Sequence, residues 1–112
     1  MAFKLIVSDT VTVPVEGRLP DDTGRAVPFT FSLVAKRLPA SGLRQAIDAN
    51  DATVPEFLTG LVQGWSGVLG DDGKEVPFSP AGLAALFDIV GMAQLCFQTY
   101  LQACGARGKE KN

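Results

Sequence analysis

The side chains that most often carry catalysis are few in this chain, and their spacing argues against chemistry. The two cysteines, Cys96 and Cys104, are eight positions apart, and histidine is absent. A nucleophilic cysteine needs a base to form its thiolate, and histidine is the usual one. On a helix that rises about 1.5 Å per residue, the two Cα atoms would lie about 12 Å apart, too far for a disulfide. The pattern therefore predicts two free, buried and inert thiols, as expected in the cytoplasm.

The acidic and glycine-rich stretch before Lys74 approaches two ligand-binding patterns without meeting either. Asp71 and Asp72 are adjacent, whereas a calcium loop needs spaced oxygen ligands and a terminal glutamate. Glycines recur at every third position from Gly64 to Gly73, but no Gly-Lys-Ser/Thr precedes a helix as it does in a phosphate-binding loop. We therefore expect a turn here, with no metal and no cofactor.

One acidic residue and a set of aromatic residues remain, and they point to partner binding. Asp88 follows Phe87 in an otherwise apolar segment, where it either faces solvent or holds a residue of a partner. Each aromatic residue is either core or an interface anchor, because Trp and Tyr are enriched at binding hot spots. The candidate partner-binding residues are Trp65, Phe78, Phe87, Asp88, Phe97 and Tyr100.

The first third of the chain must supply the strands that position these residues. Residues 11–19 and 28–38 alternate apolar and polar side chains with period two, which predicts half-buried strands. The turn residues of "LPDDTGR" lie between them and favour a long hairpin. Pro14 cannot donate to a ladder, so its strand is an edge or is bulged there. A further strand is expected at Phe3–Val7, alongside the hairpin.

After Leu38 the apolar period changes to 3.6, which predicts helices. The first is short and lies within "PASGLRQAIDAN", with Leu43, Ala46 and Ile47 on its apolar side. The second starts at a capping box of Thr53 and Glu56. Its apolar stripe is expected to run through Phe57, Leu58, Leu61, Val62 and Trp65.

The stretch "GWSGVLGDDGKEVPFSP" joins this helix to the next. Its acidic-glycine turn allows 68–69 to pair with 75–76 as a miniature hairpin. Ser79 and Pro80 fit the N-cap and the first helical position, and Phe78 has the spacing of a hydrophobic staple with Leu83. The next helix is expected to bury Leu83, Leu86, Phe87 and Val90. The last helix, after a kink at Gly91, is expected to bury Cys96, Phe97, Tyr100, Leu101 and Cys104 and to end near Gly105.

These elements predict one α+β domain over residues 1–106: an N-terminal antiparallel β-hairpin or three-stranded sheet over 1–38, then a C-terminal bundle of about four helices over 39–106. Residues 107–112 are expected to form a flexible tail. Hydrophobic residues make up 46% of the 112 residues and mean hydropathy is +0.19, so the surplus apolar side chains point to an interface. Net charge is −2 without a basic stripe, which argues against nucleic-acid binding.

The sequence also gives no sign of a secretory or membrane protein. It shows no signal-peptide pattern. The most apolar window, residues 83–101, is interrupted by Asp88 and Gly91, and it predicts two buried helices in place of a membrane span.

The C-terminal half resembles the tail assembly chaperones of long-tailed bacteriophages and prophages. The resemblance rests on "GWSGVLGDDGKEVPFSPAGLAALF", a tryptophan and an acidic-glycine turn before Pro-Phe-Ser and a Leu/Ala helix, followed by a second helix with an aromatic residue such as Tyr100. It covers about residues 53–106. It implies a non-enzymatic protein of the host cytoplasm that binds the tape measure protein, keeps it soluble during tail assembly, and is not part of the finished virion.

The resemblance implies further partners as well. Tail tube subunits are one. Another is a longer form of the same chain made by ribosomal frameshifting, since Arg107–Lys109 permits the slippery codons CGG-GGA-AAG. The hydrophobic surplus is equally compatible with a homo-oligomer.

Two other interpretations stay open. A structural virion component, such as a head–tail connector or tail tube protein, more often carries a long extended β-arm, which the sequence does not reveal. A small enzyme or regulator with an unrecognised site is disfavoured because histidine, metal-ligand spacing and a phosphate loop are missing.

Overall fold

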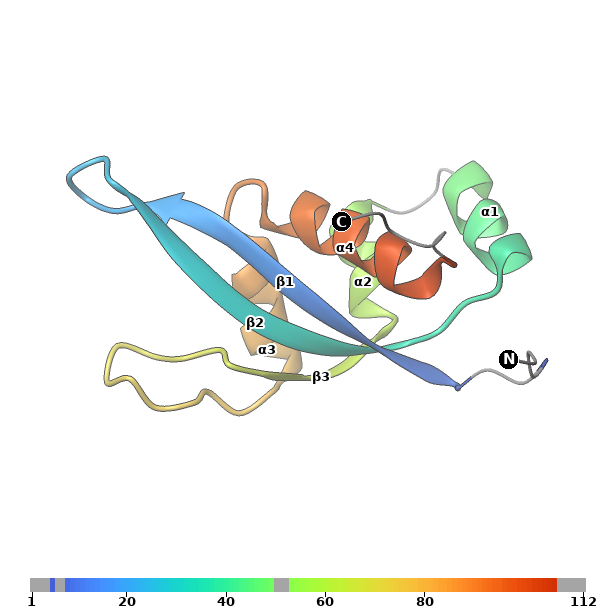
Figure 1. Ribbon diagram of the computed structural model, residues 1–112, viewed down its shortest axis with the longest axis horizontal. Coiled ribbons are helices and arrows are strands. Elements are labelled where there is room, and N and C mark those ends of the chain that lie inside the picture. Colours follow the sequence, from blue (N-terminus) through green and yellow to red (C-terminus); the bar gives the residue numbers. More distant parts are fainter. Residues whose placement is uncertain (1–4, 6–7, 50–52, 107–112) are drawn as a thin grey trace, which may run out of the picture.

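The computed structural model describes residues 5, 8–49 and 53–106. Its elements are β1 (Thr10–Pro20), β2 (Ala26–Lys36), α1 (Ala40–Ala49), α2 (Val54–Thr59), β3 (Val62–Ser66), α3 (Pro80–Phe87) and α4 (Met92–Cys104) (Figure 1). A three-stranded antiparallel sheet with four helices confirms the predicted α+β class. The strand expected at Phe3–Val7, of which only Leu5 is described, and the tail at 107–112 lie outside the described residues.

The predicted long hairpin forms from β1 and β2. Its register pairs Thr10 with Lys36 at one end and Pro20 with Ala26 at the other. The turn between them is held by Asp21, whose Oδ1 accepts bonds from the backbone N–H groups of Thr23 and Arg25, both at 2.9 Å. These bonds, with one from the Thr23 hydroxyl as the leading cause, lower the pKa of the Asp21 carboxyl. Among the described strands the order is β1-β2-β3, which places β1 at an edge, as Pro14 predicted.

The third strand is not where the sequence placed it. The helix expected to continue to Trp65 ends at Thr59, with Gly60 as its C-cap, and Val62–Ser66 forms β3 against β2. Trp65 lies opposite Leu33, and a bulge follows between Val34 and Ala35 of β2. The same apolar residues fit a helical stripe, but Gly60 and Gly64 disfavour a helix there, and an extended Val62–Ser66 pairs with the backbone of β2.

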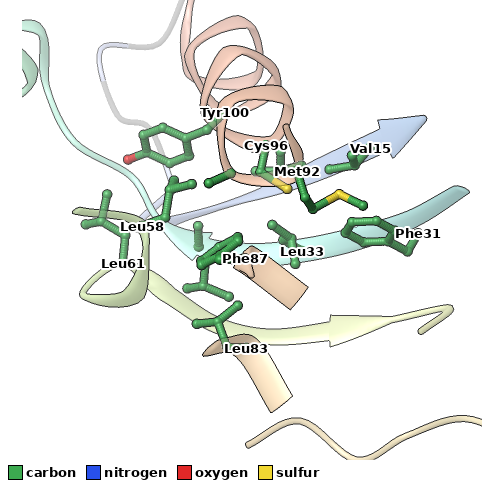
Figure 2. Packing of buried hydrophobic residues seen from close by; sticks show 14 residues of the cluster. Val15, Phe31, Leu33, Leu58, Leu61, Leu83, Phe87, Met92, Cys96 and Tyr100 are labelled. Carbon is green, nitrogen blue, oxygen red and sulfur yellow. The ribbon is translucent and has the colours of Figure 1, made fainter. Parts of the chain in front are cut away.

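The core lies between one face of the sheet and the helices. Val13, Val15, Leu33 and Ala35 point to this face and are buried, whereas the alternate residues of the same strands are exposed apart from the half-buried Ser32. In Figure 1, α3 lies behind the hairpin. In Figure 2, Met92 and Cys96 extend from α4 toward the sheet residues. The helices contribute Leu58, Leu83, Phe87, Met92, Ala93, Cys96 and Tyr100 to this core.

The predicted helix starts after residue 52 are confirmed. The Thr53 side chain accepts a bond from Glu56 N–H at 3.4 Å, and Ser79 Oγ accepts one from Gly82 N–H at 3.0 Å, with Pro80 as the first residue of α3. Each hydroxyl satisfies a backbone donor that has no partner inside its helix.

The break between α3 and α4 is sharper than a kink. The helix α3 ends at Phe87, and Gly91, at φ +82°, redirects the chain so that the two axes differ by 105°. Val90 was expected in the buried stripe of α3; it lies beyond the helix end and is 95% exposed. No single helix among the described residues is long and apolar enough to span a membrane, and α3 and α4 reach that length and hydropathy only as a bent pair.

Two hydrogen bonds tie the end of α4 to the end of β2. The Tyr100 hydroxyl donates to the Lys36 carbonyl at 2.7 Å, and the Arg37 guanidinium donates to the Cys104 carbonyl at 3.2 Å. Both join residues more than 60 positions apart in the chain. They fix where α4 crosses the sheet.

We predict that Tyr100→Phe lowers the free energy of unfolding by about 1–2 kcal/mol, because it removes the donor to a partly buried carbonyl and keeps the ring. Urea denaturation monitored by circular dichroism would measure this. Thr99→Val is the matched control: its hydroxyl donates to the Leu95 carbonyl within the same helix, so the change should be below about 0.5 kcal/mol. Equal effects of the two variants would contradict a special role for the Tyr100 bond.

Candidate functional site

The structure separates the six candidate residues into three groups. Trp65 and Phe78 form a pair beside α3, while Phe97 and Tyr100 lie on α4 facing α2. The third group is Phe87 and Asp88 at the end of α3. The six therefore do not form one contiguous binding site, and each group has its own role.

Trp65 holds the connection between β3 and α3 in place. Its Nε1–H donates to the Val76 carbonyl at 2.8 Å, and the Phe78 ring meets it edge-on at a centroid distance of 5.2 Å. The far edge of the indole lies against Gly82 of α3, where a Cβ would come within 2.9 Å of it. Trp65 thus contacts the sheet, the loop and the helix at once, which favours a structural role for this half-buried residue.

The loop that Trp65 anchors has the predicted miniature hairpin. Leu69 pairs with Glu75, and Val76 N–H donates to the Val68 carbonyl at 2.7 Å. Asp72 Oδ1 accepts a bond from Lys74 N–H at 3.0 Å. The acidic-glycine turn therefore uses its carboxylate to hold its own backbone, as the turn interpretation predicts.

Phe97 and Tyr100 are brought together by Phe57, which the sequence analysis did not single out as a site residue. Phe57 of α2 meets both rings edge-on, at centroid distances of 5.6 Å to Phe97 and 6.3 Å to Tyr100. Burial raises the pKa of the Tyr100 hydroxyl, so it stays protonated and donates to Lys36. Tyr100 is 1% exposed, and it can reach a partner only if the core opens.

Phe87 and Asp88 contribute to a groove between α2 and α3. This groove, of about 410 Å³, is lined by Pro55, Glu56, Thr59, Ala84, Phe87 and Asp88. The carboxylates of Glu56 and Asp88 are exposed, whereas the Phe87 ring is 8% exposed and belongs to the core. The groove thus combines small apolar contacts with two acidic groups, which suits a segment that carries both apolar and basic side chains.

An apolar surface next to this groove was missed by the sequence analysis. Ile89 and Val90 directly follow Asp88 in the α3–α4 turn and are 36% and 95% exposed. Gly91 signals in the sequence that the helical pattern stops nearby, but α3 ends at Phe87, four residues earlier, so Ile89 and Val90 lie in the connecting turn. We name Ile89, Val90 and the six groove residues together the α2–α3 surface.

The cysteine and carboxylate side chains, which could carry covalent or metal chemistry, do not cluster among the described residues. In the described part of the chain, no three Cys, Asp or Glu side chains come together as they would to hold a metal ion. Cys96 and Cys104 are free, Cys96 is fully buried, and burial raises the pKa of its thiol to about 11.

Comparison with known proteins adds no assignment, since the chain matches no family model, no curated protein and no solved structure.

We predict that Gly82→Ala lowers the free energy of unfolding by about 1–2 kcal/mol, although alanine is the better helix former. The added methyl group would collide with an indole ring that its hydrogen bond and Phe78 hold in place. Urea denaturation together with Trp65 fluorescence would detect both the loss and the displaced ring.

Gly64→Ala is the control for this prediction, because a Cβ there meets nothing within 4 Å. It should leave both stability and fluorescence near the wild-type values. If Gly82→Ala stabilises the protein as an ordinary helical substitution would, Trp65 is not fixed against α3.

We predict that Cys96, isolated in a Cys104→Ser variant, reacts with iodoacetamide only as fast as the protein unfolds, because its thiol is buried and protonated. Unfolded cysteine ionises near pH 9, whereas the folded thiol holds its proton to about pH 11. Its contribution to stability is therefore complete below about pH 9 and lost as the pH rises to about 11. Rapid labelling at pH 8 without denaturant would contradict this prediction.

Proposed function

We propose that this protein is a non-enzymatic assembly factor of the phage tail assembly chaperone type. In this role it binds the tape measure protein in the host cytoplasm and keeps it soluble while the tail forms. The observation that carries the proposal is the α2–α3 surface, where apolar Ile89 and Val90 lie exposed beside a groove with two carboxylates.

The chemistry of that surface fits such a client. A tape measure protein is expected to present long amphipathic helices, and an apolar surface with a charged rim is how proteins bind such helices. The exposed carboxylates of Glu56 and Asp88 would pair with basic side chains that flank the apolar ones. Of the six predicted site residues, this assigns direct contact to Asp88 and to the exposed edge of Phe87.

The residues that carry the resemblance support the proposal in a different way. The segment from Gly64 to Phe87 forms one structural unit, in which Trp65, Phe78 and Gly82 set the angle of α3. Because α3 provides one wall of the groove, this unit controls the shape of the α2–α3 surface. The motif would then recur among such proteins because it positions the surface, without itself touching the client.

A second candidate, a structural virion component, is favoured by the hairpin. The sequence analysis found no extended β-arm, yet the end of the β1–β2 hairpin projects beyond the helices (Figure 1), and Pro20 to Pro28 are exposed. Such a projection is suited to subunit contacts in a tube or ring. Assembly of the purified protein alone into tubes or rings, seen by electron microscopy, would favour this candidate.

We predict that co-expression with the tape measure protein of the same gene cluster makes that client soluble and that the two co-purify. Val90→Asp should reduce the recovered client at least about tenfold, because a charge at this position opposes burial against an apolar helix. The 95% exposure of Val90 means that the variant should fold normally.

Leu69→Asp is the matched control, since Leu69 is 60% exposed on the distant turn before Gly70 and should not affect client recovery. Pull-down yield and client solubility are the measurements. Loss of the client with both variants would indicate non-specific adhesion, and an insoluble client with the wild type would contradict the proposed function.

A further inference from the structure

The backbone of β1 offers hydrogen-bonding groups on its outer edge at known positions. Asp21 N–H donates to the Arg25 carbonyl at 2.9 Å and Arg37 N–H donates to the Asp9 carbonyl at 2.8 Å, at the two ends of an uninterrupted register. Bonds in an antiparallel pair alternate, so the odd-numbered residues of β1 bond to β2. The even-numbered residues therefore direct their N–H and C=O groups outward, where none of the described strands pairs with them.

Two prolines occupy positions in this outward set. Pro14 and Pro20 are both even-numbered, so their missing N–H groups leave no gap in the ladder with β2. Between them, Glu16 and Arg18 are the two residues that present a backbone N–H to the outside. Glu16 and Arg18 thus lie in a short window bounded by prolines, and Thr10 and Thr12 present two further outward N–H groups on the other side of Pro14.

The sequence of this window is complementary to itself. In "PVEGRLP" each residue has a matching partner at equal distance from Gly17. Proline matches proline at 14 and 20, valine matches leucine at 15 and 19, and glutamate matches arginine at 16 and 18. An antiparallel second copy centred on Gly17 would therefore place apolar residues opposite apolar residues and each charged residue opposite one of the other sign.

We propose that β1 pairs with β1 of a second copy of this chain about a two-fold axis at Gly17. The two sheets then join into one six-stranded antiparallel sheet. Glu16 of each copy lies opposite Arg18 of the other, and Pro14 of each lies opposite Pro20 of the other.

Each part of this pairing supplies a partner for a group that the described part of the chain does not pair. Glu16 and Arg18 of each copy exchange backbone N–H and C=O bonds with Arg18 and Glu16 of the other, which makes four bonds in all. Both side chains are exposed, and β2 places only the uncharged Thr30 and Pro28 opposite them. Each carboxylate gains a guanidinium across the new strand pair. The two prolines face each other where neither can donate, so no donor is lost.

The shape beside this edge is also compatible with a second hairpin. Beyond Pro20 of the second copy, its Asp22 would come opposite Thr12. A shallow depression lined by Thr12, Pro14, Thr99, Gln102, Ala103 and Gly105 lies there, between β1 and the end of α4. The pairing uses the same edge on both copies, so it closes at two subunits and does not propagate as a filament.

The test is the molecular mass in solution, measured by sedimentation across a concentration series with the full chain. The wild type is expected to be a dimer that dissociates on dilution. Arg18→Glu places like charges opposite each other at two points and should raise the dissociation constant about tenfold or more. The double variant Glu16→Arg with Arg18→Glu exchanges the charges and should restore the dimer.

Lys74→Glu makes the same change of charge on the distant turn and should leave the dimer intact. A wild type that stays monomeric at all concentrations would overturn the proposal and would point to the expected strand at Phe3–Val7 as the occupant of the edge. A dimer that resists Arg18→Glu, or that the charge exchange fails to restore, would also overturn it, because another surface would then hold the subunits together.

Discussion

The fold depends on covering one face of the β1–β2 hairpin. Period-two alternation gives that hairpin one apolar face, and a three-stranded sheet has no second sheet to pack against, so helices must remove it from water. α4 meets this need directly: Cys96 and Tyr100 are buried over the strands, and Tyr100 bonds to the last carbonyl of β2. Because α4 is the last of the described elements, the core over the sheet is completed only when this helix packs back on strands formed near the start of the chain.

The position of α3 follows from a second, more local constraint. Only 13 residues separate β3 from α3, and Trp65 connects the two through its hydrogen bond to Val76, its contact with Phe78 and its fit against Gly82. A glycine is needed on α3 because the indole occupies the space of a side chain. The large Trp65 side chain packs against Gly82, which has none, and this contact sets how closely α3 approaches the sheet. It therefore also sets the width of the groove between α2 and α3.

Features encoded by short-range chemistry were predictable from the sequence. The hairpin, its Asp21 turn, the caps at Thr53 and Ser79 and the edge position of Pro14 each depend on residues within a few positions of one another. The strand at Val62–Ser66 was not predictable in this way, because the same apolar residues satisfy a helical and an extended pattern. The extended form is selected by pairing with β2, whose partner residues lie 27 to 34 positions earlier. Val90 was misplaced because the helical period was carried up to Gly91, whereas α3 already ends at Phe87.

The same division explains why most of the candidate binding residues make contacts inside the domain. Tryptophan and tyrosine are enriched both in interfaces and in small cores, where one large ring can contact several elements. In a domain this small, each element presents little apolar surface to its neighbours, and α2 is only six residues long. The rings of Trp65, Phe57 and Tyr100 therefore pack between elements and hold them together. What remains for a partner are groups that no internal contact requires: two carboxylates beside a groove, an apolar turn, and the backbone of an edge strand. A sequence motif built around such rings therefore indicates how the α2–α3 surface is positioned. It does not identify the side chains that would contact a partner, which can differ from one partner to another.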